Sequence, residues 1–152
     1  MANFVYNKAS ELHANGGLDW DTNTFKVMLI GMGYTPDHDH LTVSALTELA
    51  NGTGYTGGFN GSGRKTLATL SVVRVDASDR TECRISSSSV WSAINAGQFK
   101  AAVIIREMTN DADSIPVAYY DTVGSGDTFP VTTNGGDVTI NWSAVGAVQF
   151  QT

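Results

Sequence analysis

The chain has 152 residues, of which 41% are hydrophobic and 16% are charged, and its formal net charge is -6 at pH 7. Charged residues make up roughly 25% of a typical soluble domain, so their scarcity here, together with sixteen glycines, favours short strands joined by many turns. The negative charge argues against a nucleic-acid groove, because binding phosphates needs clustered Lys and Arg. We expect one domain over residues 1–152 that binds no nucleic acid.

Secreted disulfide scaffolds and membrane proteins are disfavoured by simple features of the sequence. A single cysteine, Cys83, excludes an intramolecular disulfide. Residues 1–13 lack a basic stretch followed by a long apolar run, so we expect no secretory signal. The longest apolar run, residues 101–105, is far too short to span a membrane.

Residues 1–17 predict an arm followed by a short helix. Good helix formers occupy residues 7–15, and the two glycines that follow can adopt the left-handed conformation that ends a helix. Phe4 and Tyr6 precede the helix on an arm with little else to pack against. The arm therefore either folds onto its own domain or docks on a neighbouring subunit.

A well-patterned strand and a long excursion come next. In residues 24–30 one face of the alternating pattern is wholly apolar and the other nearly so, which indicates a strand inside a sheet. Residues 31–64 are rich in glycine and poor in side chains that pack, so we expect this stretch to lie over the sheet edge or reach outward and not to extend the sheet. Within it, residues 41–49 carry apolar side chains at helical spacing, which predicts one or two helical turns with Glu48 exposed.

The remainder of the chain consists of short predicted strands separated by turns. In residues 65–76 and 80–85 the side chains alternate between two faces, and a turn separates the two stretches, which predicts an antiparallel hairpin. We expect Cys83 to face inward as a small buried hydrophobe. The run AAVII, residues 101–105, has the length of a strand covered on both faces, so we place the centre of the core there. About eight strands at this spacing indicate an all-β fold, an antiparallel β-sandwich or jelly roll with a short N-terminal helix and a long Gly-rich loop. The other expected strands cover residues 90–94, 98–108, 115–121, 129–132, 137–142 and 146–150, with a break at 124–126 and a hairpin-type turn at 133–136.

Two glycine-rich patterns resemble nucleotide-binding motifs but lack their context. GTGYTG, residues 52–57, satisfies G-x-G-x-x-G, yet that pattern binds dinucleotides only between a strand and a helix, and here more glycines follow it. GFNGSGRKT, directly after it, misses the P-loop pattern because Arg64 separates Gly63 from Lys65. A loop whose backbone runs close to another surface fits both patterns better, so we expect no nucleotide cofactor.

The segment DHDH, residues 37–40, places four potential metal ligands in a row. A calcium loop fails because Leu41 stands where an oxygen ligand is needed. A zinc site would pair His38 with His40 and would need His13 from elsewhere as a third ligand. A solvated, pH-sensitive loop is the simpler interpretation, and we expect no metal.

Catalytic groups and sugar-binding aromatic residues give weaker patterns. No nucleophile, base and oxyanion donor can be assembled from the motifs, so we expect no enzymatic activity. The carboxylate pairs Asp19/Asp21 and Asp111/Asp113 flank turns, which predicts that they cap those turns. Aromatic faces can stack on sugar rings, although tryptophans on predicted strands are more often core. The aromatic residues in question are Trp20, Trp91, Trp142, Tyr55, Tyr119 and Tyr120.

Several separated segments carry a family resemblance over nearly the whole chain: TFKVMLIGMGYTPDHDH, TELANGTGY, GRKTL, VWSAINAGQFKAAVIIREMTNDADSIPVAYYD and TTNGGDVTINWSAVG. The chain resembles a group of small virion proteins of tailed bacteriophages, which are usually encoded among head and tail genes. The resemblance implies a virion structural component without catalytic residues, specifically a capsid decoration (cement) protein.

The resemblance also implies a partner, an assembly and a location. The partner would be the major capsid protein, the assembly a homo-oligomer with a trimer favoured as in decoration proteins generally, and the location the capsid surface of the virion after assembly in the host bacterial cytoplasm. A tail or neck component and a carbohydrate-binding adhesion module remain as alternatives. The arm and the excursion supply the candidate capsid or subunit contacts, which are Phe4, Tyr6, Tyr34, Asp37, His38, Tyr55 and Phe59.

Overall fold

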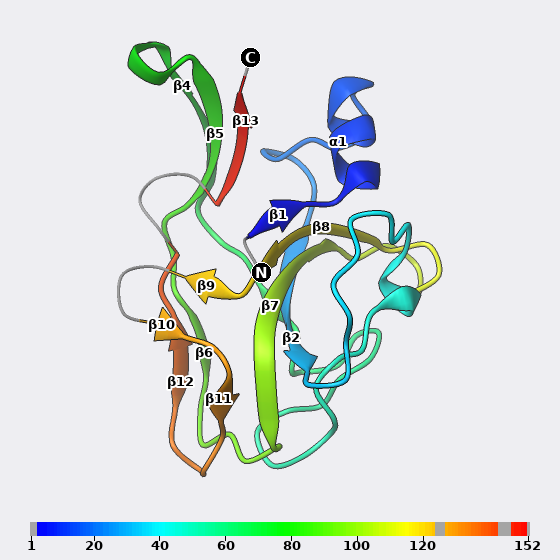
Figure 1. Ribbon diagram of the computed structural model, residues 1–152, viewed down its shortest axis with the longest axis vertical. Helices are drawn as coiled ribbons and strands as arrows, with labels where there is room; N and C mark the ends of the chain where they lie inside the picture. The colour runs from blue at the N-terminus through cyan, green and yellow to red at the C-terminus, as the bar shows by residue number, and fades with distance from the viewer. Residues whose placement is uncertain (1–2, 124–126, 143–146, 152) are drawn as a thin grey trace.

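The structure is a computed structural model that describes residues 3–123, 127–142 and 147–151. These residues form mostly β structure in antiparallel sheets, with one short helix near the N-terminus (Figure 1). The predicted break at residues 124–126 and the predicted start of the last strand at Gly146 lie outside this range. Across the described residues, no helix combines the length and the apolar character needed to span a membrane.

The apolar run AAVII lies at the centre of the main antiparallel sheet. It belongs to β7 (Gln98–Arg106), which pairs with β2 (Phe25–Gly31) on one side and with β8 (Ile115–Tyr120) on the other. Residues 101–105 have no exposed surface, so the predicted centre of the core is confirmed. The strand order is β1-β8-β7-β2-β3, where β1 (Phe4–Val5) and β3 (Lys65–Thr66) are short outer strands. A further short strand, β11 (Val131–Thr132), pairs with the start of β7. β9 (Thr122–Val123) and β10 (Asp127–Thr128) form a separate two-stranded ladder.

A three-stranded sheet is built on the predicted hairpin. β4 (Leu70–Val75) pairs antiparallel with β5 (Arg80–Ile85), and β13 (Val148–Gln151) pairs with the other edge of β5. Cys83 is buried, so its predicted inward orientation is confirmed. The single long strand predicted before the hairpin turn is wrong, because Thr69 adopts a φ of 55° and turns the chain from the main sheet into this second sheet.

A two-stranded ladder joins β6 (Ser89–Trp91) to β12 (Val138–Ile140). The hairpin predicted around residues 133–136 is wrong, since β11 before this turn pairs with β7 whereas β12 after it pairs with β6. The turn instead pairs with the segment after β6, where Gly135 N–H donates to the Ile94 carbonyl oxygen at 2.8 Å. Gly135 has a φ of 90°, which explains why this turn contains glycine.

The N-terminal helix α1 (Asn7–Ala14) forms where the sequence predicts it. It ends as expected, because Gly16 adopts a φ of 75° and Gly17 N–H donates to the Leu12 carbonyl oxygen at 2.7 Å. The arm before the helix folds onto its own chain through β1, which pairs with the outer edge of β8. This pairing selects the first of the two interpretations of the arm.

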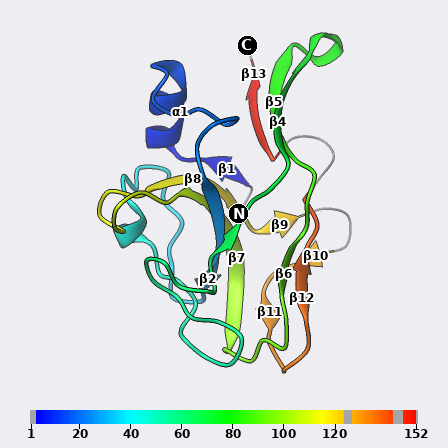
Figure 2. The same ribbon diagram turned by 180° about the vertical axis from the view of Figure 1, so that it is seen from behind.

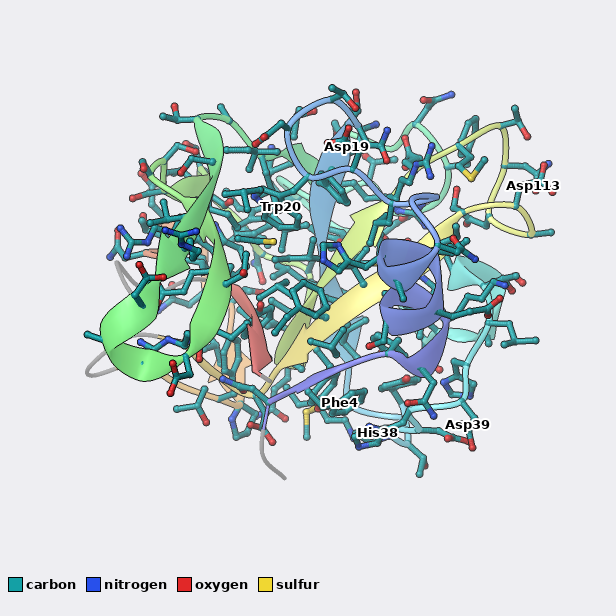
Figure 3. The ribbon with its side chains drawn as sticks, turned by 90° about the horizontal axis from the view of Figure 1, so that it is seen from above. Phe4, Asp19, Trp20, His38, Asp39 and Asp113 are labelled. Atoms are coloured by element: carbon teal, nitrogen blue, oxygen red, sulfur yellow. The ribbon has the colours of Figure 1, made fainter. Side chains whose placement is uncertain are left out.

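The helix, the main sheet and the three-stranded sheet share one core. Trp20 packs on Phe25 of β2 with ring centroids 4.5 Å apart, and its Nε1–H donates to the Arg84 carbonyl oxygen of β5 at 3.2 Å. Figure 3 shows Trp20 between the hairpin and α1. A cavity of about 10 Å³ is lined by residues of α1, β1, β5, β8 and β13, so these elements meet at one point of the interior.

Candidate interaction surface

The excursion, residues 31–64, is folded against the edge of the main sheet. Glu48 forms an antiparallel bridge with Ile30 of β2, and Leu49 N–H donates to the Leu29 carbonyl oxygen at 2.8 Å. The prediction that the excursion covers the sheet edge is therefore confirmed. The prediction that it does not extend the sheet is wrong over this short stretch, where backbone pairing needs no packing side chain.

Of the one or two helical turns predicted within residues 41–49, the structure has one. One 3-10 turn, η1 (Val43–Ala45), is formed there. Val43 N–H donates to the carbonyl oxygen of Ser114 at 2.9 Å, so this 3-10 turn is bound to the loop between β7 and β8. Because the next residues run along β2, the backbone leaves the helical conformation after one turn.

A buried ion cluster holds the excursion on the sheet. Arg64, whose side chain is 1% exposed, binds Glu48 Oε2 through Nη2 at 2.7 Å and Asp111 Oδ1 through Nη1 at 2.6 Å. Its Nη1 also binds Glu107 Oε2 at 3.1 Å, and Lys26 of β2 pairs with the other oxygen of Glu107. Arg64 and Glu48 come from the excursion, whereas Glu107 and Asp111 follow β7, so the cluster joins three segments distant in sequence.

Each of the three carboxylates in this ion cluster has a cationic partner, Arg64 or Lys26. Burial by itself lowers the pKa of the Arg64 guanidinium, but hydrogen bonds to Asp111 and Glu48 outweigh it and hold the pKa above its ordinary value. Glu48, predicted to be exposed, is mostly buried because it binds Arg64. Among the described residues, every buried side-chain nitrogen and oxygen has a hydrogen-bond partner. Removing one partner of a buried, fully hydrogen-bonded ion pair is strongly destabilising, because the other charge is left buried without a partner.

Tyr55 connects the ion cluster to the main sheet. Its hydroxyl donates to Glu48 Oε1 at 2.9 Å and accepts from Leu29 N–H at 3.1 Å. Burial raises the pKa of the Tyr55 hydroxyl, and the nearby charge of Glu48 raises it further, so the group stays neutral and can donate. Gly63 lies against the ring, where an added Cβ would come within 2.8 Å of ring carbons, and its carbonyl oxygen accepts from Trp91 Nε1–H at 2.6 Å.

The arm contacts the excursion through stacked rings. Phe4 lies between His38, with ring centroids 3.9 Å apart, and Tyr119 of β8, with centroids 5.0 Å apart. Asn7 N–H donates to the His38 carbonyl oxygen at 3.0 Å, and Asn7 Nδ2–H donates to Asp39 Oδ1 at 2.6 Å. Figure 3 shows Phe4, His38 and Asp39 along one side of the molecule. The DHDH segment is thus held beside β1 and α1.

Tyrosines beneath these rings form a hydrogen-bonded chain. The hydroxyls of Tyr6 and Tyr34 lie 3.0 Å apart, and the Tyr34 hydroxyl lies 2.8 Å from Nδ1 of His40. Burial raises the pKa of Tyr6 and of Tyr34, and it raises the pKa of Tyr119 to about 12. These hydroxyls are therefore neutral near pH 7, and they fix the arm to the excursion.

The predicted contact residues fall into two groups. Tyr6, Tyr34 and Tyr55 are buried within the chain, where they stabilise the arm and the excursion. Their side chains do not lie at the surface. The exposed or half-buried members are Phe4, Asp37, His38 and Phe59.

Aromatic residues considered for sugar stacking are all in the interior. Each is less than 10% exposed, so none of these rings offers a free face, and the expectation that strand tryptophans are core residues is confirmed. The buried set is Trp20, Trp91, Trp142, Tyr55, Tyr119 and Tyr120.

The large apolar side chains that are exposed lie in a few places. Among the described residues, three of the six come from the excursion: Met32, Phe59 and Leu41, which is 63% exposed. The others are Val72 of β4, Val90 of β6 and Met108 after β7. Exposed apolar groups on a well-anchored segment are candidates for contact with another protein.

A groove of about 410 Å³ lies beside the arm. Tyr119, on which Phe4 stacks, lines it, and so does Lys100, which donates from Nζ to the Tyr34 carbonyl oxygen. The groove continues the contact surface from the arm to the start of the excursion. Its other lining residues are Pro36, Asp121, Thr122, Phe129 and Pro130.

The motifs that resemble ligand sites are used for internal contacts. The next element after GTGYTG is the strand β3 and not a helix, and Thr53 within the motif pairs with Asn95. Lys65 Nζ–H donates to the Ser62 carbonyl oxygen at 3.0 Å. In the described part of the chain, no group of three or more His, Cys, Asp and Glu side chains is placed to hold a metal ion. His13, the third zinc ligand considered, stacks on Phe150 instead.

Three of the carboxylates predicted to cap turns can be placed. Asp19 Oδ1 accepts from Asp21 N–H at 3.0 Å, which confirms the prediction for Asp19. Asp113 Oδ2 instead accepts from the side chain of Asn110, through Nδ2–H at 2.7 Å, and Asn110 Oδ1 accepts the backbone N–H groups of this turn. Asp111 is different, because its carboxylate binds Arg64. No local pattern in the sequence predicts this ion cluster, although a lone arginine inside a glycine-rich run is a position where a buried partner could be sought.

Comparison with known proteins adds no assignment: no protein-family model, no curated protein and no solved structure matches the chain.

Proposed function

We propose that this chain is a virion structural protein of a tailed bacteriophage that decorates and stabilises the assembled capsid. The proposal starts from the family resemblance of the sequence and takes the excursion, with the adjoining arm, as the surface that contacts the major capsid protein. It includes the finer fold assignment, a β-sandwich or jelly roll. The protein would act by adhesion, without catalysis and without a cofactor.

One observation supports this role most: exposed apolar side chains lie on an excursion that is fixed from beneath. Leu41 and Phe59 are exposed, whereas Arg64 and Tyr55 tie the same segment to the sheet. A contact segment that is already ordered loses less conformational entropy on binding. The excursion can therefore bind another protein without first folding.

The stabilising effect on the shell follows from mass action. A protein that binds only the assembled shell lowers the free energy of that state and leaves the free subunits unchanged. Weak contacts at each copy gain strength if several copies are linked, and a trimer suits the local symmetry of a shell. The major capsid protein is accordingly the proposed partner, and the capsid surface the proposed location.

Binding to purified particles tests the proposal. We expect saturable binding to expanded heads of the same phage and none to unexpanded heads, measured by co-sedimentation. The double variant Leu41→Ser/Phe59→Ser should raise the dissociation constant roughly tenfold or more, because two apolar contacts are lost. Val90→Ser, which removes an exposed apolar group on a different sheet, should bind like the wild type.

Two outcomes would contradict the proposal. Binding to tails or necks and not to heads would favour the tail or neck alternative. Binding that Leu41→Ser/Phe59→Ser leaves unchanged, with a thermal midpoint equal to that of the wild type, would remove the excursion as the contact surface.

A further inference from the structure

The hairpin of β4 and β5 has one strand edge that no other strand of the described residues covers. In the three-stranded sheet the order is β13-β5-β4, so β4 is an outer strand, and within the described residues nothing pairs with its outer edge. Figures 1 and 2 both show the hairpin projecting beyond the body of the molecule, with its tip away from the main sheet. A projecting, uncovered edge is a template for pairing with another strand.

The backbone groups on the free edge can be identified from the pairing of the hairpin. Ser86 N–H donates to the Thr69 carbonyl oxygen at 3.2 Å, in the same register as the strand pair Leu70 with Ile85. Antiparallel residues alternate between pointing their N–H and C=O groups at the partner strand and away from it. Ser71, Val73 and Val75 therefore point theirs at β5, and the outward groups belong to Leu70, Val72 and Arg74.

The composition of this edge favours pairing. β4 reads LSVVRV, in which three of the six residues are β-branched valine; it contains no proline and no lysine, and Arg74 is its one charged residue. Natural sheets commonly protect an outer strand with such residues or with a bulge. The register of β4 with β5 is continuous from Leu70 to Val75, so β4 has no bulge to turn its edge away.

A second copy of the same edge is complementary to the first. If two β4 strands run antiparallel about a two-fold axis through Val72, the outward groups of Leu70, Val72 and Arg74 face those of Arg74, Val72 and Leu70 in the second copy. Each such pair can exchange two backbone hydrogen bonds. Shifting the axis to any other residue leaves at least one outward residue of each strand unpaired. The axis through Val72 therefore gives the only two-fold register in which all three outward residues of both strands are paired.

The side chains agree with this register. Val72 is 43% exposed in the single chain, and it would lie against its counterpart in the second copy, where cross-strand β-branched pairs are favourable. Arg74 would lie opposite Leu70, which its aliphatic stem can cover. The two Arg74 residues would be displaced by four positions, about 13 Å along the strands, which exceeds the Debye length of about 10 Å at 0.1 M salt.

We infer that β4 is a dimerisation edge: two copies of this chain pair through residues 70–74 of β4 and join their three-stranded sheets into one continuous sheet. The contact is small, so the association of two free copies is weak. The β4 contact would form to a larger extent between copies that another interaction already holds close together, because their effective concentration is higher. The inference does not depend on the proposed function, because it concerns the chain by itself.

The first test compares two substitutions of equally exposed valines. Val72→Lys places like charges opposite each other at the two-fold axis, whereas Val90→Lys makes the same change on β6, at a valine that is also 43% exposed. Sedimentation equilibrium up to about millimolar concentration should show a concentration-dependent dimer for the wild type. Val72→Lys should raise the dissociation constant roughly tenfold or more, and Val90→Lys should leave it unchanged.

Hydrogen exchange gives a second and independent readout. In the dimer the amides of Leu70, Val72 and Arg74 become protected, whereas those of Ser71 and Val73 are already protected by β5 in the monomer. We expect hydrogen exchange to slow with rising protein concentration only at the amides of Leu70, Val72 and Arg74. A monomer at all concentrations, an oligomer that Val72→Lys does not weaken, or concentration-independent exchange of Leu70, Val72 and Arg74 would overturn the inference.

Discussion

Replacing Arg64 with methionine removes the cation at the centre of the ion cluster but keeps most of the side-chain volume. Glu48, Glu107 and Asp111 would then be left without their shared partner. Removing one member of a buried ion pair costs about 3–5 kcal/mol. Asp111 is 30% exposed and can be rehydrated, and Glu107 keeps Lys26, so we expect the lower end, about 3 kcal/mol.

Urea unfolding followed by tryptophan fluorescence measures this loss. With a slope of about 2 kcal/mol per molar urea, the midpoint of Arg64→Met should fall by about 1.5 M. Arg74→Met is the matched control, because Arg74 is 81% exposed in its ion pair with Asp76 and such pairs contribute at most about 1 kcal/mol. Midpoints of Arg64→Met and Arg74→Met that fall by the same amount would refute the role of the ion cluster.

Three further predictions concern packing and titration. Gly63→Ala should lower stability by about 1–3 kcal/mol, because its Cβ would meet the ring of Tyr55, whereas Gly33→Ala, with no atom within 4 Å, should not; equal melting temperatures for the two variants would contradict this. Burial raises the pKa of the Cys83 thiol from 9.0 to about 12. The stability that the neutral thiol contributes is therefore present below pH 9 and is lost as the pH rises toward 12. The melting temperature of Cys83→Ala should fall less over this alkaline range than that of the wild type. Hydrogen bonds from the two flanking arginines of β5 hold the pKa of Glu82 below its ordinary 4.5, so its contribution is present above pH 4.5 and is lost as the pH falls through the lowered value. The difference in melting temperature between wild type and Glu82→Gln should therefore shrink in acid, and a difference independent of pH would show that the carboxylate is not held in this way.

The strands could be predicted because their signal is local. Alternation in residues 24–30 and the uniformly apolar run at 101–105 follow from which faces of each strand are covered, and the structure places both in the main sheet. The signal for the end of the helix is equally local, since it consists of the glycines that directly follow the helix. Pairing partners were harder to predict. The turn at 133–136 has the composition of a hairpin turn, but composition does not determine which strands the flanking residues join.

The internal structure of the excursion could not be predicted for a related reason. Its glycine content indicates a loop, but its order depends on Arg64 meeting Glu107 and Asp111, which lie 43 and 47 residues further along the chain. Sequence spacing carries no information about a contact of that range. The same long-range packing explains why Tyr55, predicted to face a partner, is buried beneath the excursion.

A cryo-electron microscopy reconstruction of the virion tests the proposed role most directly. We predict density for this chain on the outer surface of the head, with the excursion and Phe59 directed toward the major capsid protein. Density restricted to the tail or neck, or copies on the head whose excursion points to solvent, would contradict it.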